Sequence, residues 1–173
     1  MTLFADTGIP MLAVVWPFMW LAFLPVVVIE SLVALKSLGL RFRRALMVTA
    51  AANTVSTLVG IPVAWLVLLG IEWMPYFVGI PDDTRWQTAI AVATQWAWIS
   101  PFGNLGITIP IAAVVLCVPF YFVSVWIEYL VVRRMVANDF SQVRRFCWWA
   151  NLWSYMAIVL FWGGCILTSI YAS

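Results

Sequence analysis

The chain alternates long stretches without charge with short segments that carry charge. The uncharged stretches run over 7–29, 45–71, 86–127 and 146–173. A transmembrane helix needs about 20 mostly apolar residues, so the first, second and fourth stretches each fit one crossing. The third stretch is longer and is interrupted by turn-forming residues at 100–110, so we place its crossing at 111–132. The pattern predicts an all-α integral membrane protein with four transmembrane helices.

The segment 86–98 is apolar but too short to cross a bilayer. It follows the second predicted crossing, carries almost no charge and contains Trp86, Trp96 and Trp98. Such a segment is typical of a helix that lies in the membrane interface. We therefore expect a short interfacial helix in the outer loop, with its tryptophans contacting the interface or a partner subunit. A lid over a pocket between the hairpins is the alternative.

Composition and charge placement support this interpretation and orient the helices. The chain is 65% hydrophobic and 9% charged, whereas soluble domains carry about 25% charged residues. Cytoplasmic loops of membrane proteins are enriched in Lys and Arg, and short hydrophobic loops with this bias suit a bacterial inner membrane. We expect the basic residues to be cytoplasmic and available to anionic lipids, with both termini on the outer, periplasmic side. They form two clusters, Lys36, Arg41, Arg43 and Arg44, and Arg133, Arg134, Arg144 and Arg145.

A shift of the sequence by 98 positions reveals an internal repeat. The shift aligns "VVIESLV" (27–33) with "VWIEYLV" (125–131), and "ANTVS" (52–56) with "ANLWS" (150–154). Matched polar residues are informative here because polar residues are rare inside membranes. The repeat predicts two tandem helical hairpins related by a parallel duplication, as in some transporters. We expect one membrane domain, with hairpin 1 at about 9–71, the outer loop at 72–108 and hairpin 2 at about 109–172.

The repeat also marks a candidate polar site within the membrane. Glu30 lies six residues before Lys36, and Glu128 lies six residues before Arg134. Along a helix, six residues place each glutamate about 9 Å deeper in the membrane than its basic residue. Each asparagine follows its glutamate by 23 residues, which brings the two side chains to a similar depth. The members of this site are Glu30, Asn53, Ser56, Glu128, Asn151 and Ser154.

Two interpretations of these residues stay open. In the first, each carboxylate pairs with a loop arginine and with the asparagine, and so fixes the hairpin. In the second, the carboxylates respond to protons or cations, or anchor a cationic ligand. One face of the second predicted helix carries small residues, Ala52, Ser56 and Gly60, at a spacing that lets helices approach closely. We expect this face to pack against protein.

The composition also excludes several kinds of chemistry. The chain has no histidine, no C-x-x-C pair, no phosphate-binding loop and no nucleophile motif. We therefore expect no metal, no cofactor and no enzyme activity, although an enzyme that uses carboxylates alone stays open as a less favoured class. No motif in the chain is diagnostic of a characterised family.

The function expected from the sequence is that of a structural or accessory subunit of a larger membrane assembly. The missing chemistry and the apolar, tryptophan-rich surface favour it. The alternative is a small oligomeric transporter or channel that uses the repeated Glu/Asn pairs to handle protons, cations or a cationic ligand. The expected partners are the lipid bilayer and other membrane subunits or further copies of the chain. The net charge of +2 follows from the topology and does not indicate nucleic acid.

Overall fold

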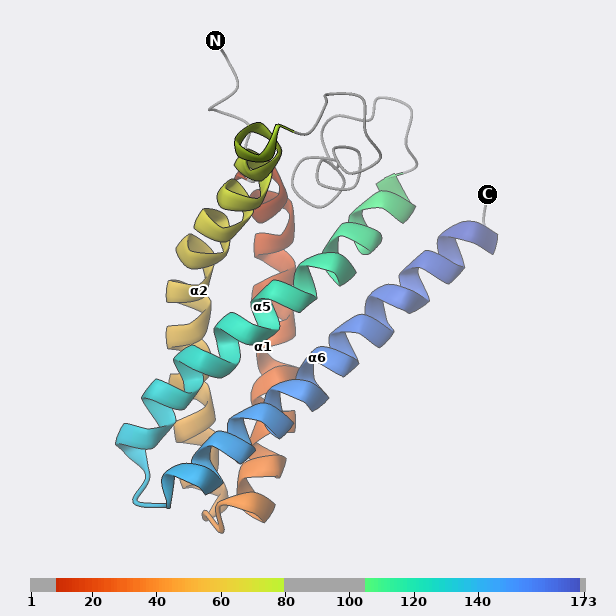
Figure 1. The fold of residues 1–173 in the computed structure, drawn as a ribbon. Helices are drawn as coiled ribbons and strands as arrows, with labels where there is room; N and C mark the ends of the chain where they lie inside the picture. Colours follow the sequence, from red (N-terminus) through yellow and green to blue (C-terminus); the bar gives the residue numbers. More distant parts are fainter. Residues whose placement is uncertain (1–8, 80–104, 172–173) are drawn as a thin grey trace.

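The computed structural model describes residues 9–79 and 105–171. Within these ranges every element is an α-helix, and all four helices are long and apolar enough to cross a membrane. This confirms the predicted all-α membrane protein with four candidate spans. The proposed interfacial helix at 86–98, with its three tryptophans, lies outside the described residues. The helices are α1 (Ile9–Ser37), α2 (Phe42–Val78), α5 (Leu105–Met135) and α6 (Phe140–Tyr171) (Figure 1).

The four helices form a bundle in the cyclic order α1, α2, α5 and α6, so the two helices of each hairpin are neighbours. A short turn joins α1 to α2, another joins α5 to α6, and both turns lie at the same end of the molecule (Figure 1). The start of α1 and the end of α6 lie at the opposite end. The main contacts of α1 are with α2 and α6, and those of α5 are also with α2 and α6. Each helix therefore packs against one helix of each hairpin.

Polar contacts between the two turns hold the hairpins together at this end. Helix α1 ends before Gly39, which has a φ of 64° and so adopts the left-handed conformation that glycine reaches most readily. The carbonyl groups at the end of a helix lack partners within it. Hairpin 2 supplies these partners, because Gln142 Nε2 donates to Ser37 O at 2.6 Å and Asn138 Nδ2 donates to Leu38 O at 3.2 Å.

The core is densest in the half of the bundle near these turns. Small and branched side chains from all four helices are fully buried there, among them Ala34, Ala45, Val132 and Val143. Small residues allow helix axes to approach closely in a membrane. The predicted small-residue face of α2 is confirmed, because Ala52, Ser56 and Gly60 are all buried.

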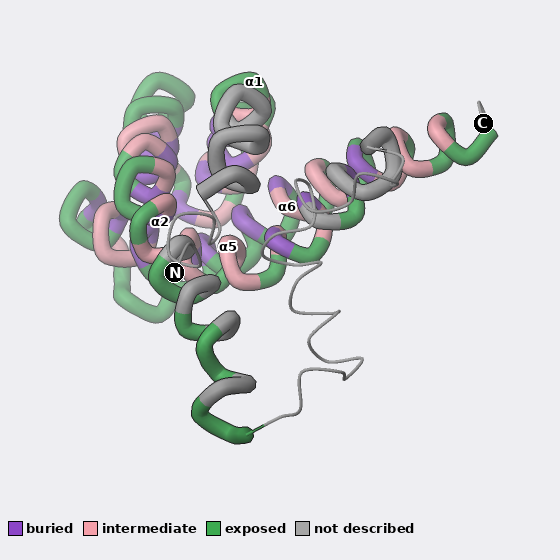
Figure 2. Tube along the Cα trace, turned by 90° about the horizontal axis from the view of Figure 1, so that it is seen from above, coloured by how far each residue is buried: buried purple, intermediate pink, exposed green. Residues whose placement is uncertain are grey.

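The other half of the bundle is more open. Of the side chains that the structure describes in α2 after Gly60, none is buried, and in α6 after Ser154 only Trp162 is buried. The end of α6 lies away from α1 and α2 both in the side view and from above (Figures 1 and 2). Large apolar side chains such as Leu160 and Phe77 are exposed on these segments, as expected of surfaces in contact with lipid or other membrane proteins.

Candidate functional site: a buried carboxyl pair

Each hairpin contains one hydrogen bond between an asparagine and a glutamate. Asn53 Nδ2 of α2 donates to Glu30 Oε2 of α1 at 2.5 Å, and Asn151 Nδ2 of α6 donates to Glu128 Oε2 of α5 at 2.6 Å. The two residues of each pair are separated by 23 positions. The helical rise places them level on either side of a short turn, as the depth estimate from the sequence expects.

A second bond fixes the orientation of each asparagine amide. Asn53 Nδ2 also donates to Thr49 O at 3.0 Å, and Asn151 Nδ2 donates to Cys147 O at 3.1 Å. Both acceptors lie one helical turn earlier in the same helix. A primary amide has two N–H groups, so the donors of both asparagines are fully used. Each amide is therefore held with one hydrogen aimed at a carboxyl group of the neighbouring helix.

The serines connect the two hairpins crosswise. Ser154 Oγ of α6 donates to Glu30 Oε1 at 3.0 Å, and Ser56 Oγ of α2 donates to Glu128 Oε1 at 3.2 Å. Each hydroxyl shares its one hydrogen with the backbone carbonyl of the asparagine three residues earlier, at 3.1 Å. Each glutamate thus accepts one bond from the asparagine of its own hairpin and one from the serine of the other. The bonds join α1 to α2, α2 to α5, α5 to α6 and α6 back to α1. We call these six residues the carboxyl ring: Glu30, Asn53, Ser56, Glu128, Asn151 and Ser154.

The two carboxyl groups are buried without a basic partner among the described residues. Glu30 and Glu128 are each 1% exposed, and their side-chain bonds come from amide and hydroxyl groups only. The sequence left open that each carboxylate pairs with a loop arginine and so fixes the hairpin. No such pair is found in the part of the chain that the structure describes. The eight basic residues of the two predicted clusters are all exposed near the turns, at Lys36, Arg41, Arg43, Arg44, Arg133, Arg134, Arg144 and Arg145.

The basic side chains make their contacts at that surface. Arg44 Nη2 donates to Met135 O at 3.4 Å, and Arg134 Nη1 donates to Leu130 O at 3.0 Å. The guanidinium of Arg133 lies 5.7 Å from the centre of the Tyr129 ring. These positions suit contact with lipid headgroups and leave the carboxyl pair uncompensated.

The two asparagines differ in their surroundings. Asn151 is fully buried, and its Oδ1 atom has no hydrogen-bond partner among the described residues. A buried acceptor without a donor is unfavourable by about 1–3 kcal/mol. Asn53 instead borders a cavity. The two halves of the carboxyl ring are therefore similar in bonding but different in access.

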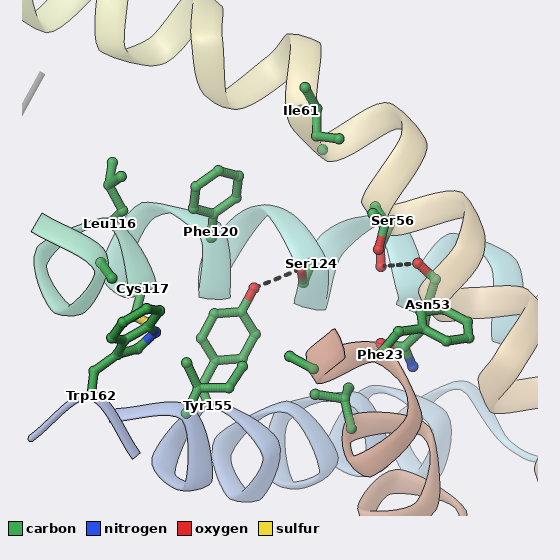
Figure 3. A pocket seen from close by; sticks show the side chains of 16 residues that line it. Phe23, Asn53, Ser56, Ile61, Leu116, Cys117, Phe120, Ser124, Tyr155 and Trp162 are labelled. Carbon is green, nitrogen blue, oxygen red and sulfur yellow. Dashed lines mark hydrogen bonds between the residues drawn. The ribbon is translucent and has the colours of Figure 1, made fainter. Parts of the chain in front are cut away.

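The cavity has a volume of about 130 Å³ and receives side chains from all four helices. Asn53 and Ser56 belong both to the carboxyl ring and to the wall of the cavity. The other lining residues lie farther from the basic turns along their helices. Figure 3 shows Phe120 and Tyr155 beside the cavity, with the Tyr155 hydroxyl bonded to Ser124 at 3.0 Å. The walls are mainly apolar and aromatic, and the polar groups are few. Such a lining is typical of binding sites for small molecules.

Positions that the 98-residue shift relates line this cavity in pairs. Three of the four pairs place the smaller residue in hairpin 1 and the larger one in hairpin 2. The cavity therefore lies between faces of the two hairpins that the 98-residue shift relates. The pairs are Ala22 and Phe120, Val26 and Ser124, Thr57 and Tyr155, and Gly60 and Ile158.

The structure brings the six polar residues singled out in the sequence into one site. Sequence reasoning missed the aromatic lining, including Phe120, Tyr155 and Trp162. Aromatic residues in a span are usually packing or interface residues, so their type gave no signal. Tyr155 directly follows the repeated serine Ser154, and this adjacency was the available clue.

Comparisons with known proteins supply no relative from which a function could be transferred. No family model, no curated protein and no solved structure matches the chain. Among the described residues, no group of three or more His, Cys, Asp or Glu side chains could hold a metal ion. The carboxyl ring and its cavity are therefore the candidate functional site of the described chain.

Proposed function

We propose that this protein is a small membrane transporter or channel for protons or other cations, with the carboxyl ring as its charge-binding site. One observation carries the proposal. Two buried carboxyl groups have no basic partner in the described part of the chain, and they lie beside a cavity between all four helices.

The energetics of burial favour this function over a purely structural one. Amide and hydroxyl groups can bond helices together in a membrane without any charge. An ionised carboxylate is far more costly to bury unless a cation or a proton neutralises it. A pair of such groups, Glu30 and Glu128, therefore has a physical reason to take up positive charge. Ionisable residues within membrane proteins characteristically mark such pathways.

The unpaired oxygen of Asn151 is consistent with this role. Asn151 donates both of its side-chain hydrogens, one of them to Glu128, and its Oδ1 atom needs a donor or a cation. A proton or cation that arrives at Glu128 would supply positive charge close to this atom. The Asn151 Oδ1 atom would then have a favourable partner when a proton or cation is bound, and none among the described residues when the site is empty.

The proposal includes an orientation and an origin for the hairpins. Basic turns are typical of cytoplasmic loops, so we place the turns of both hairpins in the cytoplasm and both termini outside, with a bacterial inner membrane as the expected setting. We attribute the matched ring residues to a parallel duplication of one hairpin. Four helices enclose little space, so we expect the working unit to be an oligomer.

Flux measurements in proteoliposomes test the proposal. We expect protein-dependent flux of protons, measured with an internal pH-sensitive dye, or of K⁺ or Na⁺, measured under an imposed gradient. Glu30→Gln and Glu128→Gln remove the charge with little change of shape and should abolish this flux in folded protein. Asp139→Asn is the matched control, because this exposed carboxyl lies between α5 and α6. Wild-type flux of each cation in the Glu30→Gln/Glu128→Gln double variant would contradict the proposal.

A second candidate is the accessory subunit of a larger membrane assembly, favoured by the exposed aromatic side chains of α6. Trp148, Trp149 and Trp153 are 44%, 53% and 52% exposed and offer a broad surface to a partner. Aromatic side chains are enriched in the cores of protein interfaces. The test is the mass of the protein extracted with its native lipids into nanodiscs. A large particle with other subunits would favour this candidate, and a small homo-oligomer would favour transport.

A further inference from the structure

We infer that the cavity beside the carboxyl ring binds a small organic cation of the methylated-ammonium class. This inference names the ligand class of the proposed site and so rests on the proposed function. It draws on the size of the cavity, the chemistry of its walls and the charge behind them.

The size of the cavity suits a ligand of a few atoms. Its volume is about 130 Å³. An engineered apolar cavity of about 150 Å³ in another protein holds a benzene molecule. A ligand of roughly five or six non-hydrogen atoms therefore fits, and tetramethylammonium is of this size.

The walls suit a cation that carries methyl groups. Aromatic rings from three helices line the cavity, with Phe23 on α1, Phe120 on α5, and Tyr155 and Trp162 on α6 (Figure 3). Aromatic side chains grouped around a site attract quaternary and methylated ammonium ions through the negative faces of their rings. A bare Ca²⁺ or Mg²⁺ ion would instead need about six oxygen ligands, which this mostly apolar lining does not offer.

A carboxyl group of the ring supplies the complementary charge when it releases its proton. Glu30 and Glu128 each lie four residues, or about 6 Å along the helix, from the cavity-lining residues Val26 and Ser124. Asn53 and Ser56 stand between the carboxyl groups and the cavity. Electrostatic attraction at this range is strong where water is scarce, so a cation is favoured over a neutral molecule of equal size.

Binding of radiolabelled tetramethylammonium to the full chain in nanodiscs tests the inference. The wild-type protein should bind it saturably, and Gly60→Ile should lower the affinity at least tenfold. A Cβ atom at residue 60 meets only Val123 Cγ1, at an ordinary 3.9 Å, so the added side chain fills the cavity without a clash at its base. Gly70→Ile is the matched control, since residue 70 is on the same helix, exposed, and has no atom within 4 Å of its Cβ position. Its affinity should equal that of the wild type.

Three further measurements test the cavity, the charge of the protein and the charge of the ligand separately. Ala22→Phe fills the cavity from α1 with the residue type found at the equivalent position 120, and should also lower the affinity at least tenfold. Glu30→Gln leaves the cavity in place but removes charge, and should lower the affinity several-fold. The neutral analogue tert-butanol should not displace the label at concentrations where unlabelled tetramethylammonium does.

Three results would overturn the inference. They are no saturable binding by the wild type, wild-type affinity in both cavity-filling variants, and equal displacement by tert-butanol, which would indicate an apolar or lipid-chain pocket. Glutamate-dependent proton or metal-cation flux without tetramethylammonium binding would refute this inference and leave the proposed function standing. Tetramethylammonium binding without any flux of it or of other cations would refute transport and leave the binding site standing.

Discussion

Ser154 of α6 donates a hydrogen bond to Glu30 of α1 at 3.0 Å, across 124 residues of sequence. This bond joins the first described helix to the last and closes the carboxyl ring. Its counterpart runs from Ser56 to Glu128 at 3.2 Å. Because each serine bonds the glutamate of the other hairpin, the ring fixes the relative position of the hairpins at the depth of the buried charge.

Removal of one crosswise bond should weaken the bundle. Hydrogen bonds within membranes contribute about 0.6–2 kcal/mol, so Ser154→Ala should lower the unfolding free energy by that amount. Ser37→Ala is the control, because Ser37 Oγ donates to Val33 O in its own helix and, among the described residues, joins no other helix. Thermal unfolding in detergent, followed by circular dichroism, measures both. Equal melting temperatures of the two variants would show that the crosswise bond does not stabilise the bundle.

The Glu30–Asn53 pair should be energetically linked. Glu30→Ala leaves the Asn53 amide without its carboxyl acceptor, and a buried unpaired group costs about 1–3 kcal/mol. Asn53→Ala should therefore be less harmful in the Glu30→Ala background than alone. A double-mutant cycle measures this coupling, expected at about 0.5–3 kcal/mol. A second cycle, between Glu30 and the exposed Thr168 of α6, should be additive within about 0.5 kcal/mol. Additivity of both cycles would contradict the prediction.

Gly39 should resist substitution because of its backbone conformation. Its φ of 64° is unfavourable for a residue with a Cβ atom by about 1–2 kcal/mol, so Gly39→Ala should destabilise the protein by that amount. The space around residue 39 is open, so a loss would reflect the backbone and not a clash. Gly163→Ala, at an open position inside α6, should be neutral or slightly stabilising. A stable Gly39→Ala variant would show that the turn relaxes.

Asp139 should stabilise the start of α6 in a pH-dependent way. Its carboxylate accepts hydrogen bonds from the backbone N–H and the hydroxyl of Ser141, and these bonds lower the pKa of Asp139. A lowered pKa means that the stabilisation is complete above the ordinary carboxyl pKa and is lost as the pH falls through the value in the folded state. Asp139→Ala should thus melt at a lower temperature than wild type at neutral pH, and the difference should shrink in acid. A difference that is constant with pH would contradict this.

The orientation can be tested by fusions at the two ends of the bundle. If the basic turns are cytoplasmic, alkaline phosphatase fused after residue 173 should be active, because that enzyme works only outside the cytoplasm. A fusion that replaces the chain after Asn138, in the turn between α5 and α6, should be inactive. The reverse pattern of activities would place the basic turns outside.

The amino-acid pattern alone was enough to predict which segments can cross the membrane and which polar residues lie inside them. Long uncharged stretches are sufficient to identify the segments that cross the membrane. Polar and charged residues are rare within such segments, so the few present stand out. The level positions of Glu30 and Asn53 also followed from the sequence, since helical rise along a short hairpin fixes their depth. The ends of the helices were predicted less closely. The uncharged stretches stop at residues 29 and 71, whereas α1 continues to Ser37 and α2 to Val78.

The bonds from Ser154 to Glu30 and from Ser56 to Glu128, and the cavity beside them, could be seen only in the folded bundle. These contacts depend on how the two hairpins pack, and no local spacing encodes that packing. The interior of a membrane protein is about as apolar as the lipid around it, so an apolar residue such as Phe120 carries no sign of which way it faces. Polar residues mark the inside of this bundle from sequence alone, whereas the place of each apolar side chain follows from the contacts between helices.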